Sequence, residues 1–151
     1  MTRRHVALVP LTHDHHHALA HARRLRLAAG GDAHELLHQS QGFLDFFHND
    51  TLNHFREEEE VVFPLAIGDE RVSDLLSRVV TEHLQIRAMA ARLAIEVDEA
   101  RVHGQTALEL AEALEAHIRL EEREVFPLLE EVVSDDQLRG ITLGPRNRGS
   151  A

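Results

Sequence analysis

Apolar side chains recur every three to four residues in four stretches of the chain, with polar side chains between them. On a helix this spacing gathers the apolar side chains on one face. The four stretches span residues 12–28, 32–63, 69–102 and 106–133, and short connections join them. Four amphipathic helices joined in this way predict an all-α fold, specifically an antiparallel up-down four-helix bundle within residues 1–133.

Residues that favour helix ends mark the limits of these stretches. Thr12, Asp32 and Thr106 are predicted N-caps. A glutamate three residues after Asp32, and another three residues after Thr106, completes the pattern of a capping box. Pro64 lacks the N–H of a helical hydrogen bond, so the second helix is expected to kink or end near Phe63.

Two terminal segments lie outside the helical pattern. Residues 1–10 read as a short extended arm that ends at Pro10. From residue 134 onward the composition changes to Asp, Gly, Pro, Arg, Asn and Ser. We therefore expect residues 134–151 to form a loosely ordered C-terminal tail.

The chain is acidic and contains no cysteine. Its 16 Lys and Arg residues are all Arg, against 26 Asp and Glu, which gives a formal net charge of −10 with His neutral. This balance argues against binding of nucleic acid or of an anionic membrane surface. The absence of Cys excludes a disulfide framework, a thiolate metal site and a thiol nucleophile. Because the chain has no long uncharged apolar run, we expect a cytoplasmic protein.

One twelve-residue motif occurs twice, beginning at His54 and again at His117, with eight identical positions. Each copy contains His-x-x-x-Glu, which ends at Glu58 in the first copy and at Glu121 in the second. On a helix this spacing stacks the imidazole and the carboxylate on one face, one turn apart. The spacing alone occurs by chance at this His and Glu content. The surrounding identities, above all a shared Phe-Pro, make the repeat informative.

Two further histidines, His15 and His83, lie in the apolar stripes of the first and third helices. With the duplicated motif they give six predicted metal ligands: His15, His54, Glu58, His83, His117 and Glu121. A repeated ligand pattern in a helix bundle indicates two half-sites of a dinuclear centre. Imidazole and carboxylate ligands without thiolate suit iron, manganese or zinc, and bridging carboxylates favour iron or manganese. The alternative is a metal-free bundle braced by buried His–Glu hydrogen bonds.

These motifs resemble those of the hemerythrin family, specifically the hemerythrin HHE cation-binding domains. The resemblance covers residues 11–133 and rests on His13-Asp14-His15-His16, His54-x-x-x-Glu58 with Phe63-Pro64, Glu82-His83, and His117-x-x-x-Glu121 with Phe126-Pro127. It implies a non-haem di-iron centre inside the bundle. His15 and His54 would hold one iron, and His83 and His117 would hold the other. Glu58 and Glu121 would bridge the two ions.

The chain differs from oxygen-carrying hemerythrins at two positions. Arg87 replaces a second histidine one turn after His83, and Glu121 replaces an aspartate. Both differences argue against reversible oxygen carriage. Because a guanidinium on a core face needs an anion, we expect Arg87 to bond Glu58 or Glu121. The alternative is that Arg87 extends along the helix and reaches water or a surface glutamate. In the acidic run 57–60 only Glu58 lies on the apolar face, and the other three glutamates are expected to be solvated.

The expected function is binding or sensing of a small oxidant or gas at a di-iron centre, with oxygen, nitric oxide and peroxide as the candidates. One alternative is a di-iron oxidase or peroxidase with catalase-like turnover, and another is iron storage or stress defence. Absence of Tyr argues against a tyrosyl-radical generator. Absence of Cys argues against the iron-cluster-repair relatives that carry a cysteine-bearing segment. We favour a metal- and gas-binding protein over an enzyme and assign no catalytic residue.

Overall fold

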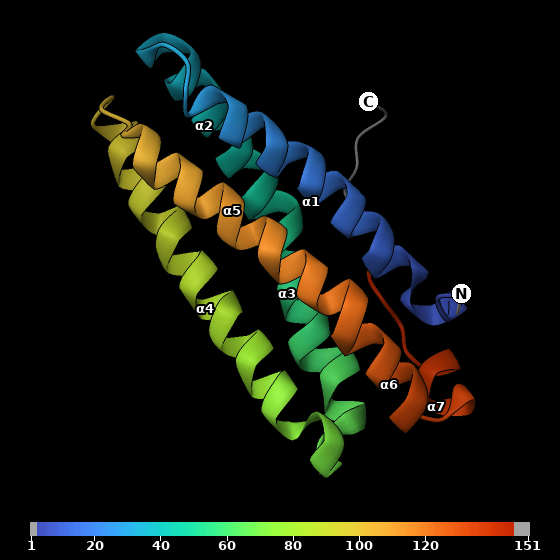
Figure 1. Cartoon of the computed structure of the whole chain (residues 1–151). Coiled ribbons are helices and arrows are strands. Elements are labelled where there is room, and N and C mark those ends of the chain that lie inside the picture. Colours follow the sequence, from blue (N-terminus) through green and yellow to red (C-terminus); the bar gives the residue numbers. More distant parts are fainter. Residues whose placement is uncertain (1–2, 147–151) are drawn as a thin grey trace.

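The computed structural model describes residues 3–146, which form helices joined by short turns, with no strand among them. The all-α prediction is therefore confirmed. The long helices lie side by side as a helical bundle (Figure 1). None of the described helices is both long enough and apolar enough to span a membrane.

The bundle contains long uninterrupted helices and one segmented helical column. The uninterrupted helices are α1 (Val9–Ala28), α4 (Glu70–Asp98) and α5 (Gly104–Leu120). The segmented column consists of α2 (Ala33–Phe46), the π-helical turn η2 (Phe47–Thr51), α3 (Leu52–Glu57), the π-helical turn η3 (Glu58–Val62) and the 3-10 turn η4 (Phe63–Ala66). After α5 come the π-helical turn η5 (Glu121–Val125) and α6 (Phe126–Val132). A 3-10 turn η1 (Val6–Leu8) precedes α1, and α7 (Asp135–Arg139) follows α6.

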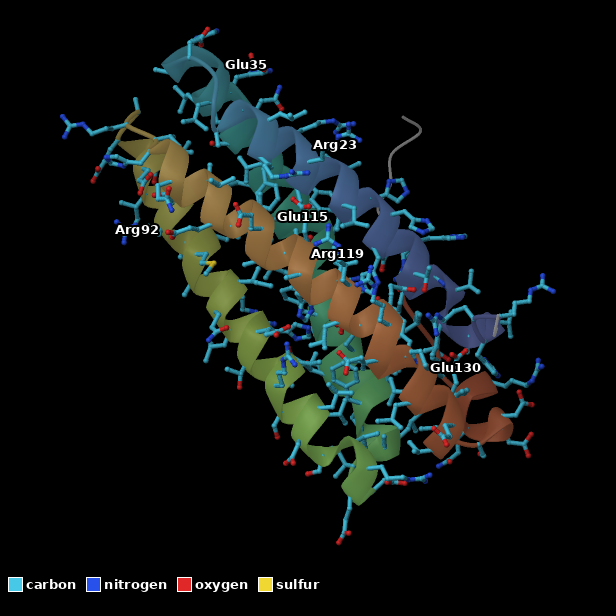
Figure 2. All side chains as sticks on the ribbon, in the orientation of Figure 1. Arg23, Glu35, Arg92, Glu115, Arg119 and Glu130 are labelled. Carbon is cyan, nitrogen blue, oxygen red and sulfur yellow. The ribbon has the colours of Figure 1, made fainter. Side chains whose placement is uncertain are left out.

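The helices enclose two apolar clusters. α1 packs against α2 and α5, and α4 packs against the same two helices. One cluster includes Leu25, Phe43 and Leu110, and the other includes Leu11 and Phe126. Charged side chains cover the outside of the bundle, where Arg23, Glu35 and Arg92 project outward (Figure 2). On α1 and α4 a buried histidine, His15 and His83 respectively, lies between the residues of the two clusters.

Helix ends agree with the sequence prediction at Asp32 and Pro64. Asp32 Oδ1 accepts a hydrogen bond from the backbone N–H of Glu35 at 2.8 Å and so caps α2. Pro64 lies in the 3-10 turn η4, and Ile67 leaves the helix with an extended backbone. The loss of helical hydrogen bonding near Phe63 is therefore confirmed.

The two predicted threonine N-caps are wrong. α1 begins at Val9, with Pro10 in its first turn, where proline is favoured. α5 begins at Gly104, where a Cβ atom would lie 2.6 Å from the carbonyl oxygen of Ala29. The threonine hydroxyls bond glutamates of neighbouring helices instead: Thr12 donates to Glu122 at 2.9 Å, and Thr106 donates to Glu96 at 2.8 Å. α4 also ends at Asp98, earlier than the predicted residue 102, and Ala100 turns the chain with φ of 52°.

The terminal segments are more ordered than predicted. The expected extended arm at residues 1–10 is wrong from Val6 onward, because η1 and α1 begin within it. In the expected loose tail, Ser134 caps α7 through a capping box, and Leu138 is buried. Beyond α7, Arg146 pairs with Glu57 at 2.7 Å. The part of the expected arm at residues 1–2 and the part of the tail at residues 147–151 lie outside the described residues.

Candidate metal centre

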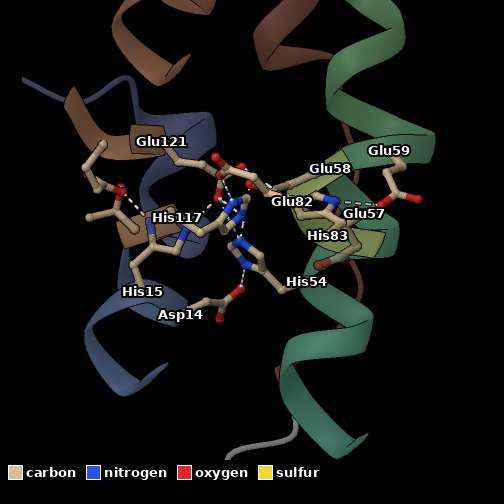
Figure 3. Close-up of polar contacts among 12 residues, drawn as sticks. Asp14, His15, His54, Glu57, Glu58, Glu59, Glu82, His83, His117 and Glu121 are labelled. Atoms are coloured by element: carbon tan, nitrogen blue, oxygen red, sulfur yellow. Dashed lines mark hydrogen bonds and ion pairs between the residues drawn. The ribbon is translucent and has the colours of Figure 1, made fainter. Parts of the chain in front are cut away.

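All six predicted ligand side chains point into one buried layer of the bundle (Figure 3). Glu58, His83 and Glu121 are at most 1 % exposed, and none of the six exceeds 4 %. His15 comes from α1, His54 from α3 and His83 from α4. The other three are Glu58, His117 and Glu121. Side chains from four separate parts of the chain therefore meet in one place.

Both copies of the duplicated motif form the same local structure. His54 lies on α3, and Glu58 is the first residue of the π-helical turn η3. His117 lies on α5, and Glu121 is the first residue of the π-helical turn η5. A π-helical turn inserts an extra residue into a helix and is frequent at functional sites. In each copy Phe-Pro follows this turn, at positions 63–64 and 126–127.

The Glu58 carboxylate lies between two imidazoles from opposite sides of the layer. Its Oε2 is 3.2 Å from Nε2 of His54, and its Oε1 is 3.1 Å from Nε2 of His83. The helical pattern has two halves, residues 12–63 and residues 69–133, and each half carries one copy of the duplicated motif. One oxygen of Glu58 thus faces a histidine of each half. This arrangement suits a carboxylate that bridges two cations.

The Glu121 carboxylate contacts imidazoles from both halves as well. Its Oε1 accepts a hydrogen bond from Nε2 of His15 at 2.9 Å and lies 3.5 Å from Nε2 of His117. Its Oε2 lies 4.0 Å from Nε2 of His83. Both carboxylates therefore occupy the middle of the layer, with the imidazoles around them.

The donor atoms form two overlapping groups, each compact enough for one metal ion. The first group is His15, His54, Glu58 and Glu121, and the second is Glu58, His83, His117 and Glu121. Within each group the candidate donor atoms lie within 4.8 Å of one another. The two groups share both carboxylates, so two ions held here would be neighbours.

Unsatisfied polar atoms in this layer fit a cation. Among the described residues, Nε2 of His54, His83 and His117 has no hydrogen-bond partner. The same is true of both carboxylate oxygens of Glu58 and of Oε2 of Glu121. The short distances from Glu58 to His54 and His83 are therefore close contacts without hydrogen-bond geometry. A buried polar group without a partner costs about 1–3 kcal/mol, and more when it is charged, so the layer is suited to bind a cation.

Each imidazole is held from behind by a carboxylate at its Nδ1 atom. The four pairs are His54–Asp14 at 2.8 Å, His83–Glu59 at 2.6 Å, His117–Glu82 at 2.8 Å and His15–Glu122 at 2.6 Å. Because the Nδ1–H of each imidazole donates to its outer carboxylate, the Nε2 atom faces the centre of the layer, where it could bind a cation after losing its proton. This is the orientation that a histidine ligand needs.

No role was predicted for these four outer carboxylates, although Asp14 and Glu82 belong to the motifs that carry the resemblance. Glu59 was expected to be solvated, and this expectation is wrong because Glu59 bonds His83. The same expectation is wrong for Glu57, which is buried and pairs with Arg146. The available signal for the four outer carboxylates was their position beside the ligands at equivalent places in the two halves. Asp14 and Glu82 precede His15 and His83, while Glu59 and Glu122 follow the two predicted bridging glutamates.

The charges of the buried layer depend on one another. Burial lowers the pKa of His54, but the carboxylates of Glu58 and Glu121 outweigh this effect and raise it to about 10. Burial also lowers the pKa of His117, and Glu121 again reverses the effect and raises that pKa to about 10. Burial raises the pKa of Glu121, yet His117 and the other imidazoles hold it well below its usual range. Protons on the imidazoles thus balance the carboxylates, and a cation bound here would take the place of these protons.

Arg87 does not contact the predicted bridging carboxylates. Its Nη1 lies 3.4 Å from Oε2 of Glu59, and its guanidinium carbon lies 5.5 Å from the ring centre of Phe55. The prediction that Arg87 bonds Glu58 or Glu121 is therefore wrong. The long Arg side chain lies along the aromatic ring and leaves its charge partly exposed to solvent.

A small cavity of about 20 Å³ lies beside the imidazoles. It is lined by His15, His54 and His117, by Thr51 and by mostly apolar side chains. Asp14 and Asp50 line this cavity and also a surface groove of about 850 Å³. These two aspartates therefore stand between the groove and the buried layer.

Comparison with known proteins gives one family match. The model of the hemerythrin HHE cation-binding domain matches residues 6–129, which include all six predicted ligands and the four outer carboxylates. No curated protein and no solved structure matches the chain.

Proposed function

Because the chain belongs to the hemerythrin HHE cation-binding domain family, we propose that its buried layer holds two iron ions and binds or senses a small oxidant or gas. The observation that carries this proposal is the pair of donor groups that share Glu58 and Glu121. In the proposal, His15 and His54 hold one ion, while His83 and His117 hold the other. Manganese and zinc use the same types of ligand, so the test includes metal identity.

The proposed centre fits an antiparallel four-helix bundle. We interpret the segmented column from α2 to η4 as one bundle helix and α5 with α6 as another. The contacts of α1 with α2 and α5, and of α4 with the same two helices, support this interpretation because they give every bundle helix two neighbours. Each bundle helix then contributes either a single histidine or a His-x-x-x-Glu pair to the layer.

The protein's own side chains would orient the ligands and keep water away. The outer carboxylates hold the Nδ1 protons, as described for Asp14 and Glu59. Phe55 stacks on the His83 ring with 3.9 Å between ring centres, and Phe126 stacks on His15 at 5.4 Å. Iron held by these imidazoles and carboxylates would supply redox chemistry for oxygen, nitric oxide or peroxide.

The size of the small cavity supports a ligand of two or three atoms. A cavity of about 20 Å³ has room for roughly one water-sized molecule, since about 10–15 Å³ is the minimum for a water. Its walls are mostly apolar apart from the imidazoles, the two aspartates and Thr51. Diatomic gases and peroxide fit this space, whereas organic substrates do not.

The proposal is tested by metal content and by gas binding. Protein loaded with ferrous iron should contain about two ions per folded chain. Addition of nitric oxide should change its visible spectrum. Exposed His16, next to His15, provides the control: His16→Ala should keep both ions, whereas His15→Ala should lose iron. Full folding with no bound iron, manganese or zinc would overturn the proposal.

The rate at which the iron-loaded protein consumes hydrogen peroxide distinguishes a binding protein from the enzymatic alternative. A stable nitric oxide complex with no sustained consumption of hydrogen peroxide supports binding or sensing. Steady peroxide consumption by the iron-loaded protein, lost in His15→Ala and retained in His16→Ala, would instead assign a peroxidase or catalase-like activity.

A further inference from the structure

Thr51 is a buried residue whose hydroxyl has no hydrogen-bond partner among the described residues. It is the last residue of the π-helical turn η2 and lies three residues before His54 on α3. Only 4 % of its surface is exposed. A buried hydroxyl without a partner carries a cost, so its position next to a functional layer requires an explanation.

No backbone carbonyl of η2 accepts a hydrogen bond from the Thr51 hydroxyl. A threonine inside a helix commonly donates to a carbonyl one turn earlier. Here the backbone N–H of Leu52 already bonds the carbonyl of Phe47, and no bond from the Thr51 hydroxyl to that carbonyl forms. The hydroxyl is therefore available to a molecule from outside the chain.

The surroundings of Thr51 identify where that molecule would lie. Thr51 lines the cavity of about 20 Å³ together with the imidazoles of His15, His54 and His117. The imidazoles use their Nδ1 atoms for carboxylates, and their Nε2 atoms face the predicted metal positions. Of the groups lining the cavity, Thr51 supplies the neutral hydroxyl donor, while Asp14 and Asp50 at the groove side supply acceptors.

We propose that the Thr51 hydroxyl donates a hydrogen bond to a diatomic or peroxide ligand held in this cavity, and that it sets the lifetime of the bound ligand. This inference rests on the proposed function and adds the residue that retains the ligand. An oxygen atom of nitric oxide, of molecular oxygen or of peroxide accepts such a bond.

Ser40 provides a matched control within the same protein. Its side chain is fully buried on α2, and its hydroxyl also has no partner among the described residues. Ser40 is not among the residues that line the cavity. Loss of the Ser40 hydroxyl therefore reproduces the loss of a buried polar group without a change at the cavity.

The experiment measures dissociation of nitric oxide from the iron-loaded protein by stopped-flow absorbance. Thr51→Val keeps the shape of the side chain and removes the donor, so dissociation should become about twofold to tenfold faster, the worth of one neutral hydrogen bond. Thr51→Ser should restore the wild-type rate, and Ser40→Ala should leave it unchanged. Equal rates in wild type and Thr51→Val, at matched iron content, would overturn the inference while leaving the proposed function intact. Absence of any nitric oxide complex in the wild type would overturn both.

Thermal unfolding without metal gives a second, independent readout. If the Thr51 hydroxyl has no protein partner, a methyl group in its place should leave the melting temperature unchanged or raise it. A melting temperature of Thr51→Val clearly below that of the wild type would mean that the hydroxyl bonds the protein, and it would overturn the inference.

Discussion

Glu59 accepts a hydrogen bond from Nδ1 of His83 at 2.6 Å, although the two residues belong to different halves of the duplicated sequence. The equivalent pair, Glu122 with His15, crosses between the halves in the opposite direction at 2.6 Å. Asp14 holds His54 within the first half, and Glu82 holds His117 within the second. Each half therefore supplies a carboxylate that holds one imidazole of the other half. The symmetry of the site follows from the repeat.

Glu58→Ala should reduce metal content at both positions. Glu58 directs one oxygen toward His54 and the other toward His83, so its removal takes one donor from each group. We expect iron content to fall from about two ions per chain to below one. Elemental analysis of folded protein measures this. The exposed Glu124 on η5 is the control, and Glu124→Ala should keep both ions. Loss of one ion with the other fully retained would rule out the bridging role.

Glu59→Gln should weaken metal binding without removing a ligand. Glutamine keeps the size of the side chain but withdraws the negative charge that accepts the His83 Nδ1 proton. Loss of such a partner typically costs 10–100-fold in metal affinity, and we expect about tenfold here. Competition with a chelator measures the affinity. Glu124→Gln is the matched control, because Glu124 is exposed and contacts neither predicted donor group. Equal affinities of the two variants would contradict the role of Glu59.

The sequence was sufficient to predict which six side chains meet in the buried layer, but not which carboxylates hold the four imidazoles. The six inward-facing side chains follow from helical periodicity and from one repeat, both of which act over short distances. The partner of each imidazole lies on another helix, and only packing decides which carboxylate reaches it. Glu59 illustrates the limit: on its own helix it lies off the apolar stripe, yet a neighbouring helix brings His83 to it.

The wrong N-cap predictions have the same physical origin. Local sequence rules treat Thr12 and Thr106 as caps, because Thr hydroxyls favour helix ends. In the folded chain each hydroxyl donates to a glutamate of a neighbouring helix, Glu122 and Glu96 respectively. Thr12 thereby helps to hold Glu122, the carboxylate that orients His15. A long-range partner outweighed a local preference at both positions.

Glu96→Gln should destabilise the metal-free protein in a pH-dependent way. Glu96 is buried at the end of α4 and accepts hydrogen bonds from the backbone N–H of His103 at 2.9 Å and from Thr106 at 2.8 Å. Burial raises the pKa of Glu96, but these hydrogen bonds outweigh it and lower the pKa below the usual 4.5. We expect a loss of about 1–3 kcal/mol in the free energy of unfolding at pH 7.

The sign of the pH effect follows from the lowered pKa of Glu96. The stabilising contribution is complete above the unfolded-state pKa and is lost as the pH falls through the folded-state pKa. The difference between wild type and Glu96→Gln should therefore be largest at neutral pH and should shrink below about pH 4.5. Urea unfolding at pH 7 and in acid measures it, with the exposed Glu99→Gln as the control. A difference that grows in acid would contradict the assignment.

Arg146 should hold the C-terminal segment around Gly144 beside the predicted metal-binding layer. Its Nη1 pairs with Glu57 at 2.7 Å, and its Nε lies 3.3 Å from Oδ1 of Asp14, whose other oxygen accepts the His54 proton. The backbone N–H of Gly144 also donates to Glu57 at 2.7 Å. These contacts explain why the expected loose tail packs beside the surface groove. Arg146→Ala should therefore release the segment from the groove and leave Asp14 without the guanidinium that faces it.

Hydrogen exchange at the Gly144 amide measures this release directly. We expect strong protection in the wild type and fast exchange in both Arg146→Ala and Glu57→Gln. Because the two side chains act as one unit, the double variant should exchange no faster than either single variant. Chelator-induced iron loss should also become faster in Arg146→Ala, since Asp14 then orients His54 less firmly. Arg139→Ala is the control, because Arg139 pairs with Asp135 on exposed α7 away from the groove. Additive effects of the two substitutions, or unchanged exchange at Gly144, would show that Arg146 does not hold the segment in place.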